Sequence, residues 1–308
     1  MTGMRELVVL GTASQAPTRS RNHNAYVLRW DSEAFLFDPG EGTQRQMLLA
    51  GVRSGSLTRI CLTHLHGDHC LGLPGVVQRR GLDGVTTAVP LHYPHAGRPQ
   101  VEALLSSTAH VPVAAVEHCP VAGDGPIARG AGWTLSARFL DHRVPTAGYR
   151  LVEDDGVRML PDRLAAAGVT GADVGRLARE GTLRVGGRTV RVEDVSAPRP
   201  GQVVAVVMDT RWCQAALELA SGADLLLCES TFLHEDAALA EEYGHLTARQ
   251  AGMLAREAGA RLLVLTHYSQ RYGDDVTPFA AEAAVHAPHV VAAQDLQVVR
   301  VPRRRALR

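Results

Sequence analysis

One short stretch of the chain (THLHGDH) carries four side chains of the kinds that bind metal ions. They are His64, His66, Asp68 and His69, and they directly follow an apolar run. Imidazole and carboxylate groups are good ligands for zinc. Their spacing does not let all four close one tetrahedron, so the pattern predicts two adjacent ions. Gly67 permits the sharp turn that this arrangement requires.

Three later residues occupy equivalent places in the chain, and these are His142, Asp209 and His267. Each is the first ligand-type residue after an apolar run, apart from Asp141 beside His142. The runs that precede them cover residues 133–140, 203–208 and 261–266. Taken singly, each residue has an ordinary structural explanation. Together they favour a metal site with two ions, built where strands end.

The elements that must position these residues alternate between strands and helices. Predicted strands cover residues 5–10, 25–30, 34–38, 57–63, 89–93, 133–140, 203–208, 223–228 and 261–266. Predicted helices cover residues 43–50, the residues after 68, 212–221 and 247–258. This alternation indicates an α/β layered fold in which helices cover sheets. We expect a single domain over residues 1–308.

The region from residue 153 to residue 200 has a different character. Its hydrophobic periodicity is weak, glycines are frequent, and it ends in a proline-rich segment (APRPG). We therefore predict an inserted arm at about residues 154–194. Its arginines are Arg158, Arg163, Arg176, Arg179, Arg184, Arg188 and Arg191. They could form a phosphate-binding stripe, or equally a solvated face interleaved with acidic residues.

Composition narrows the class of protein. Hydrophobic residues make up 45% and charged residues 21% of the 308 residues, as in ordinary globular proteins. No apolar stretch is long enough for a membrane span, and the N-terminus has no leader-like pattern, so we expect a cytoplasmic protein. The five cysteines form no CxxC pair, which argues against a thiolate site. A formal net charge of +0 excludes a globally basic chain but not a local basic patch.

The HLHGDH motif, with a later histidine, an aspartate and a final histidine, resembles the metallo-β-lactamase superfamily. Within it, the chain resembles the ribonuclease Z family along nearly its whole length. The stretches that carry this resemblance are LGTASQAPTRSRN, FDPGEGTQRQ, HLHGDHCLGLPG, GYRL, MDTR, ESTF, GHLTA and LTHYSQRY. HxHxDH alone specifies only the superfamily, whereas PTRSRN, GEGTQ, GHLTA and THYSQRY are much more particular to the family.

The resemblance implies an αββα sandwich with two zinc ions at the sheet edges. One zinc would be held by His64, His66 and His142. The other would be held by Asp68, His69 and His267, with Asp209 bridging the two. Such a donor set also accepts manganese or iron. Two zinc ions can acidify a shared water and clamp a phosphodiester.

The resemblance also implies roles outside the ligand set. Asp68 would accept a proton from the water as well as bind metal. His245 in GHLTA would lie near the scissile phosphate, where it could stabilise developing charge or protonate the leaving 3′ oxygen. The alternative for His245 is a surface histidine at a helix cap. The remaining histidines match no ligand position, and these are His23, His92, His95, His110, His118, His234, His286 and His289.

The function expected from the resemblance is removal of the 3′ trailer from precursor tRNA by a homodimer whose arms grip tRNA. One version of the family arm has a Gly-Pro motif, and the segment 168–181 lacks that proline. A first alternative is a phosphodiesterase or sulfatase of the same fold that acts on a small molecule. The arm and the PTRSRN loop argue against it. A second alternative is a non-catalytic binding module, which would be expected to have lost some of the seven ligands.

Overall fold

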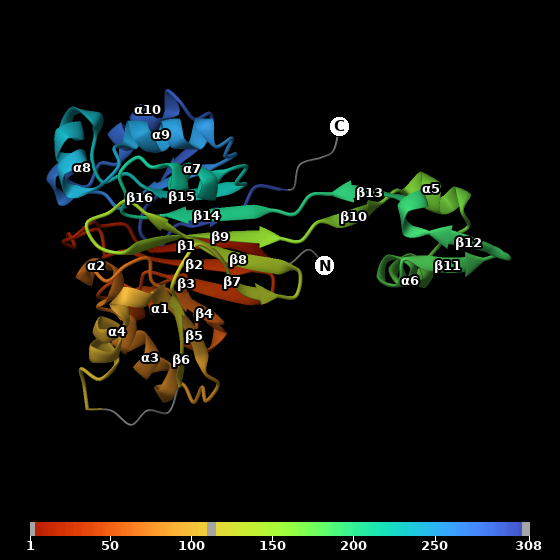
Figure 1. Ribbon diagram of the computed structural model, residues 1–308, viewed down its shortest axis with the longest axis horizontal. Helices are drawn as coiled ribbons and strands as arrows, with labels where there is room; N and C mark the ends of the chain where they lie inside the picture. Colours follow the sequence, from red (N-terminus) through yellow and green to blue (C-terminus); the bar gives the residue numbers. More distant parts are fainter. Residues whose placement is uncertain (1–3, 110–114, 304–308) are drawn as a thin grey trace.

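The computed structural model describes residues 4–109 and 115–303, and in this part of the chain two seven-stranded sheets face each other (Figure 1). The first has the order β18-β1-β2-β3-β4-β5-β6 and the second β17-β16-β15-β14-β9-β8-β7. The first sheet contains β1 (Arg5–Gly11), β2 (Ala25–Trp30), β3 (Glu33–Phe37), β4 (Arg59–Cys61), β5 (Val89–Pro94), β6 (Val116–Val121) and β18 (Val298–Arg300). The second contains β7 (Gly125–Gly130), β8 (Trp133–Leu140), β9 (Thr146–Glu153), β14 (Val203–Val207), β15 (Leu225–Glu229), β16 (Leu263–Thr266) and β17 (Val290–Ala292).

Helices cover the outer face of each sheet. Those on the first sheet's side are α1 (Thr43–Leu49), α2 (Gly67–Cys70), α3 (Leu73–Leu82) and α4 (Arg98–Leu105). Those on the second sheet's side are α7 (Gln214–Ala220), α8 (Ala237–Tyr243), α9 (Ala248–Glu257) and α10 (Thr277–Ala284). Short 3-10 turns lie at η1 (Ser54–Ser56), η2 (His95–Gly97), η3 (Val192–Asp194), η4 (His234–Asp236) and η5 (Gln270–Tyr272). The expected α/β layering, an αββα sandwich, is confirmed. No helix in the described ranges combines the length and apolar character needed to cross a membrane.

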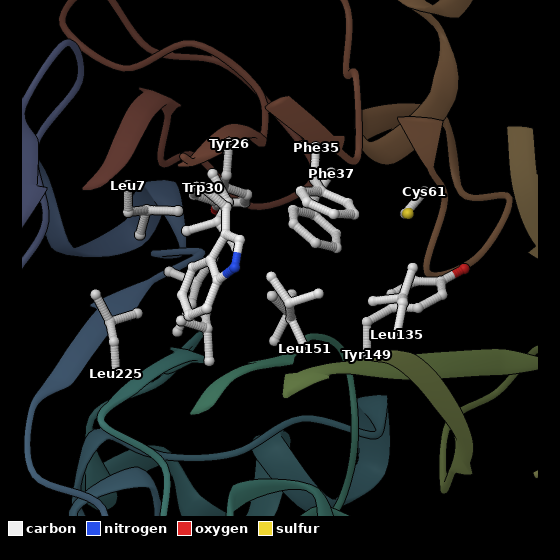
Figure 2. Packing of buried hydrophobic residues seen from close by; sticks show 14 of the residues in the cluster. Leu7, Tyr26, Trp30, Phe35, Phe37, Cys61, Leu135, Tyr149, Leu151 and Leu225 are labelled. Atoms are coloured by element: carbon white, nitrogen blue, oxygen red, sulfur yellow. The ribbon is translucent and has the colours of Figure 1, made fainter. Parts of the chain in front are cut away.

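The core between the sheets is built from alternate residues of the facing strands (Figure 2). The ring of Phe35 on the first sheet meets that of Trp133 on the second edge-on, with centroids 5.2 Å apart. Leu7 and Val9 of β1 point into this core, whereas Val8 of the same strand packs under the helices. Because both faces of the central strands are buried, these strands read as continuous apolar runs.

Several strands were not predicted from the sequence, and one was predicted too long. The predicted strand 57–63 is shorter in the structure, where β4 covers only Arg59–Cys61 and the following residues form an extended loop. β9 was not predicted, although it pairs with β8 and β14 in the middle of the second sheet. Its Gly148 is required there, because a Cβ atom would lie 2.4 Å from Leu219. That contact joins residues far apart in the chain, which local patterning does not register.

The region between β9 and β14 projects from one end of the sandwich (Figure 1). Its stalk is the antiparallel pair β10 (Gly156–Met159) and β13 (Ser196–Arg199). Beyond the stalk lie α5 (Pro161–Ala166), α6 (Ala172–Glu180), β11 (Thr182–Val185) and β12 (Arg188–Arg191). These pack around a small apolar core of their own, formed by Leu164, Val169, Leu177, Leu183, Val190 and Val195. The weak periodicity of this region reflects a core that takes few residues from each element.

Candidate metal centre

The predicted ligands meet at one end of the sandwich because each follows a strand that ends there. His64 to His69 lie between β4 and the end of α2. His142 follows β8, Asp209 follows β14, and His267 follows β16. Parallel pairing of β14, β15 and β16 brings the carboxyl ends of these strands to the same edge. The structure therefore brings all seven predicted ligand residues together.

A first set of donor atoms comes from three histidines and one carboxylate oxygen. Nε2 of His64 lies 3.0 Å from Nδ1 of His66, and Nε2 of His142 lies 3.4 Å from the same Nδ1. Oδ2 of Asp209 lies 3.4 Å from Nε2 of His64 and 3.7 Å from Nε2 of His142. Four donor atoms thus surround one point.

A second set lies beside the first and shares Asp209 with it. Nε2 of His69 and Nε2 of His267 are 3.2 Å apart. Oδ2 of Asp68 is 3.3 Å from His69 and 3.4 Å from His267. Oδ1 of Asp209, the other oxygen of that carboxylate, is 3.4 Å from His69 and 3.2 Å from His267. Asp209 therefore offers one oxygen to each set.

These separations match the edges of tetrahedral zinc sites. Zinc–nitrogen bonds of about 2.0–2.1 Å place two ligand atoms about 3.3 Å apart in a tetrahedron. The pairs given above span 3.0 to 3.7 Å. Oδ1 of Asp209 is buried and has no hydrogen-bond partner among the described residues, which is costly for a carboxylate that no cation binds. Both donor sets fit zinc in residue type and spacing.

Each histidine that points Nε2 inward uses its Nδ1 to donate a hydrogen bond outward. His69 donates to Asp38 at 2.9 Å, and His64 donates to the hydroxyl of Thr63 at 3.0 Å. Thr63 in turn donates to Asp38 at 2.7 Å. On the other side, His267 donates to the hydroxyl of Thr231 at 2.7 Å. Such bonds place the proton on Nδ1 and leave the Nε2 lone pair free for a metal.

Glu229 connects the ligand residue His267, through the hydroxyl of Thr231, to His245. Its Oε2 accepts a hydrogen bond from Thr231 at 2.6 Å, and its Oε1 accepts one from Nδ1 of His245 at 3.1 Å. The same Nδ1 lies 4.0 Å from Asp209. Nε2 of His245 has no hydrogen-bond partner in the described ranges, and the residue lines the pocket above the metal ligands. This geometry suits a proton donor better than a third metal-binding group.

Burial lowers the pKa values of His64, His66 and His142, whereas nearby carboxylates raise those of His69 and His245. Burial lowers the pKa of His69, but Asp209, Asp68 and Asp38 outweigh this effect and raise that pKa well above its ordinary value. Burial likewise lowers the pKa of His245, but Glu229 and Asp209 more than offset it and raise that pKa to about 9. Two divalent cations would neutralise the carboxylate charge around His69 and His245.

Backbone strain is concentrated at the site. Among the described residues, six non-glycine residues have positive φ, and three of them are Asp38 at 47°, Asp209 at 20° and His267 at 63°. L-residues rarely adopt this conformation, and packing must hold it in place. The strain aims these side chains at the metal centre.

The site opens into a pocket of about 780 Å³ whose wall includes Asp68, Asp209 and His245. That volume suits an organic ligand. His23 also lines this pocket, although no role was predicted for it. His92 and His95 lie outside it, and His110 lies outside the described residues.

Sequence reasoning missed Asp38 and Glu229 as parts of the site. Both follow or end apolar strands, β3 and β15, in the manner of the predicted ligands. The rule that found His142, Asp209 and His267 would have found them too. Residues of both kinds lie at strand ends. Only the distances in the structure therefore separate those that can bind a metal from those that orient its ligands.

Comparison with known proteins places this geometry in a family. The metallo-β-lactamase superfamily profile matches residues 18–137. Ribonuclease Z of Streptomyces coelicolor is 56% identical over 98% of this chain and 99% of its own. Ribonuclease Z of Chlamydia muridarum is 43% identical over 94% of this chain and 95% of its own. The crystal structure of the short form of human tRNase Z superposes with a TM-score of 0.69 at 25% identity, covering 96% of this chain and 99% of the other.

A structure at lower identity supports the fold alone. The metallo-β-lactamase fold protein YhfI from Bacillus subtilis has a TM-score of 0.70 at 18% identity, covering 96% of this chain and 98% of the other. A relative that is 56% identical over nearly the whole length of both chains establishes the family. The chain therefore belongs to the ribonuclease Z family, a family of endoribonucleases within the metallo-β-lactamase superfamily.

Proposed function

We propose that this protein is a zinc-dependent endoribonuclease that removes the 3′ trailer from precursor tRNA and leaves a 3′-hydroxyl on the tRNA. The observation that carries the proposal is the pair of donor sets that share Asp209 under a pocket holding His245. The 56% identity to ribonuclease Z supports the substrate. A precursor tRNA substrate also leads us to propose a cytoplasmic location.

The two donor sets would hold one zinc ion each. We assign His64, His66 and His142 to the first ion and Asp68, His69 and His267 to the second, with Asp209 as the bridge. When bound, two zinc ions supply an acidified water and Lewis acidity towards the phosphodiester. Manganese or iron would fit the same donors.

The chain's own residues move the protons. Asp68 accepts a proton from the attacking water, while the backbone N–H of Gln15 donates to its Oδ2 at 2.8 Å and holds the carboxylate in place. As water adds to phosphorus, the bond from phosphorus to the 3′ oxygen breaks. His245, held by Glu229, gives its proton to that oxygen. The products are a 3′-hydroxyl on the tRNA and a 5′-phosphate on the trailer.

The arm, residues 156–199, is proposed as the grip on the body of the tRNA. In the β11–β12 hairpin, Arg184 pairs with Thr189 and Thr182 with Arg191, so these four residues share the face opposite Leu183 and Val190. Arg184 is exposed and makes no ion pair within the described ranges, whereas Arg191 pairs with Glu193 at 3.4 Å. That face offers guanidinium and hydroxyl groups to phosphates.

We further propose a homodimer in which each arm serves the partner's site. The arm projects from the end of the sandwich opposite α2, so it points away from its own metal centre (Figure 1). A cavity of about 150 Å³ lies between α1 and α3, and Leu48 at its edge is 69% exposed. Leu82 at the end of α3 is 83% exposed. An apolar surface of this kind suits a second copy, and sedimentation velocity measures whether the protein is a dimer.

The direct test of the function uses two substrates with the purified zinc-loaded protein. One is a tRNA with a 3′ extension, and the other is bis-p-nitrophenyl phosphate. We expect cleavage of the tRNA at one position, with a 3′-hydroxyl on the tRNA and a 5′-phosphate on the trailer. Cleavage of the small ester alone would assign the protein to the small-molecule phosphodiesterases instead.

A further inference from the structure

Two side chains at the rim of the metal pocket have no role in the fold or in the proposed chemistry. Tyr243 is the last residue of α8 and is 42% exposed. Arg143 is exposed, and its guanidinium carbon lies 5.9 Å from the centroid of the Tyr243 ring. Both line the same pocket as Asp68, Asp209 and His245.

Arg143 differs from the other arginines near this site. Arg211 pairs with Asp141 at 3.3 Å, and Arg271 pairs with Asp236 at 3.0 Å. Arg143 has neither an ion pair nor a hydrogen bond within residues 4–109 and 115–303, and its contact is with the Tyr243 ring. An arginine without a carboxylate partner is available to a ligand.

The backbone holds this pair at a set distance from the reacting groups. Arg143 directly follows the ligand residue His142. Tyr243 directly precedes Gly244, whose carbonyl accepts the hydrogen bond from Nδ1 of His142 at 2.8 Å. His245 is the next residue after Gly244. The backbones of Tyr243 and Arg143 therefore cannot move far without moving the metal ligand and the proton donor.

An exposed ring beside a planar guanidinium is a surface on which a nucleobase stacks. The pocket contains a second such pair, in which Arg271 lies 5.7 Å from the ring of Phe232. That ring is only 7% exposed and packs against His245 at 6.0 Å, and Arg271 is engaged by Asp236. The pair at Tyr243 is the one open to a ligand.

We propose that Tyr243 and Arg143 bind the nucleobase of the nucleotide immediately 5′ to the cleaved phosphodiester bond. The inference rests on the proposed endoribonuclease function. The side is set by chemistry, because His245 protonates the 3′ oxygen, and that oxygen belongs to the 5′ nucleotide. Stacking tolerates any base, since every base presents a π face. The pair thus helps to place the scissile bond without reading the sequence.

The test combines protein variants with substrates that lack one base. Precursor tRNA is prepared with an abasic nucleotide either immediately 5′ or immediately 3′ to the cut. Wild type, Tyr243→Leu and the matched control Tyr243→Phe, which keeps the ring, are compared by kcat/KM after zinc content is checked. Tyr243→Asn serves as a second variant if Tyr243→Leu folds poorly.

We expect removal of the 5′ base to lower wild-type kcat/KM by about 10-fold or more, the scale of one base–aromatic stack. Tyr243→Leu should show the same loss on intact precursor and no further loss on the 5′ abasic substrate. Tyr243→Phe should behave as wild type. Arg143→Lys, which keeps charge but not the planar group, should lose part of the effect.

Two results would overturn the inference. The first is that the losses from Tyr243→Leu and from the 5′ abasic substrate multiply, which would mean that ring and base do not meet. The second is that Tyr243→Leu abolishes sensitivity to the 3′ base instead, which would place the pair on the trailer side. Failure of wild type to cleave any intact precursor tRNA is a different outcome and would contradict the proposed function itself.

Discussion

The backbone carbonyl of Gly244 accepts a hydrogen bond from Nδ1 of His142 at 2.8 Å. Gly244 has φ of +79°, and a Cβ atom on it would lie 2.9 Å from that nitrogen. The next residue is His245, whose own Nδ1 bonds to Glu229. A single turn of backbone therefore orients a metal ligand and carries the proposed proton donor.

Gly244→Ala should weaken zinc binding and cleavage together. The added methyl group is strained at positive φ and crowds His142, and loss of a bond that orients a ligand typically lowers metal affinity by about 10- to 100-fold. Zinc affinity is measured by chelator competition. Gly84→Ala is the matched control, because Gly84 has φ of +74° with open space around it. If Gly84→Ala lowered zinc affinity as much as Gly244→Ala, the loss would come from backbone strain and not from crowding of His142.

Asp209→Ala should be the most damaging change at a ligand, because each of its oxygens faces a different donor set. Wild type should contain about two zinc ions per chain by elemental analysis, since seven ligands are too many for one tetrahedral ion. The variant should lose most of its metal and its activity. Retention of both ions with full activity would remove Asp209 from the site.

Asp38→Asn should lower zinc affinity while leaving all seven ligands in place. Asp38 accepts hydrogen bonds from His69 and Thr63, and its charge favours the Nδ1 proton that leaves Nε2 for the metal. The expected loss is about 10- to 100-fold in zinc affinity, partly recovered in cleavage assays by excess zinc. Unchanged affinity would show that Asp38 acts on the fold alone.

His245→Ala should keep zinc content and fold but slow cleavage by about 100-fold or more, the usual scale for losing a general acid or a group that stabilises developing charge. Its Nδ1 bonds to Glu229 rather than to any ligand in the two sets. Single-turnover cleavage and elemental analysis are made on the same preparation. Loss of metal in this variant would make His245 structural.

Removal of the arm should separate tRNA recognition from chemistry. Met159 and Ser196 are the last paired residues of the stalk, so a two-residue Asn-Gly turn can join them in place of residues 160–195. We expect severe loss of precursor-tRNA cleavage with bis-p-nitrophenyl phosphate hydrolysis and zinc content nearly unchanged. Binding of precursor tRNA to the intact protein should also weaken as ionic strength rises.

Equal loss of both activities in the shortened chain would mean that the segment supports the sandwich. The two sheets do meet where the arm leaves the sandwich, because Arg5 of the first sheet donates a hydrogen bond to Glu153 at the end of β9 at 2.8 Å. The design leaves both of these residues in place. Unchanged tRNA cleavage would instead move the recognition surface elsewhere.

Much of the metal centre follows from the sequence because ligand residues and strand ends coincide along the chain. His64 to His69 lie in one short segment between β4 and the end of α2, and His142, Asp209 and His267 each come shortly after an apolar run. Local chain order alone therefore identifies which residues can bind metal. An α/β layered fold follows as well, since buried strands alternate with amphipathic helices, whereas the αββα order of the layers was implied only by the family resemblance.

Only the tertiary structure decided which atoms meet. Asp38 and Asp68 both follow strands of the first sheet, yet one orients His69 and the other stands beside His267, which is 199 positions away in the chain. The contact between Tyr243 and Arg143 likewise joins two segments that carry no common pattern. Such distances depend on how the two sheets pack and on strained backbone at strand ends, and neither leaves a periodic trace in the sequence.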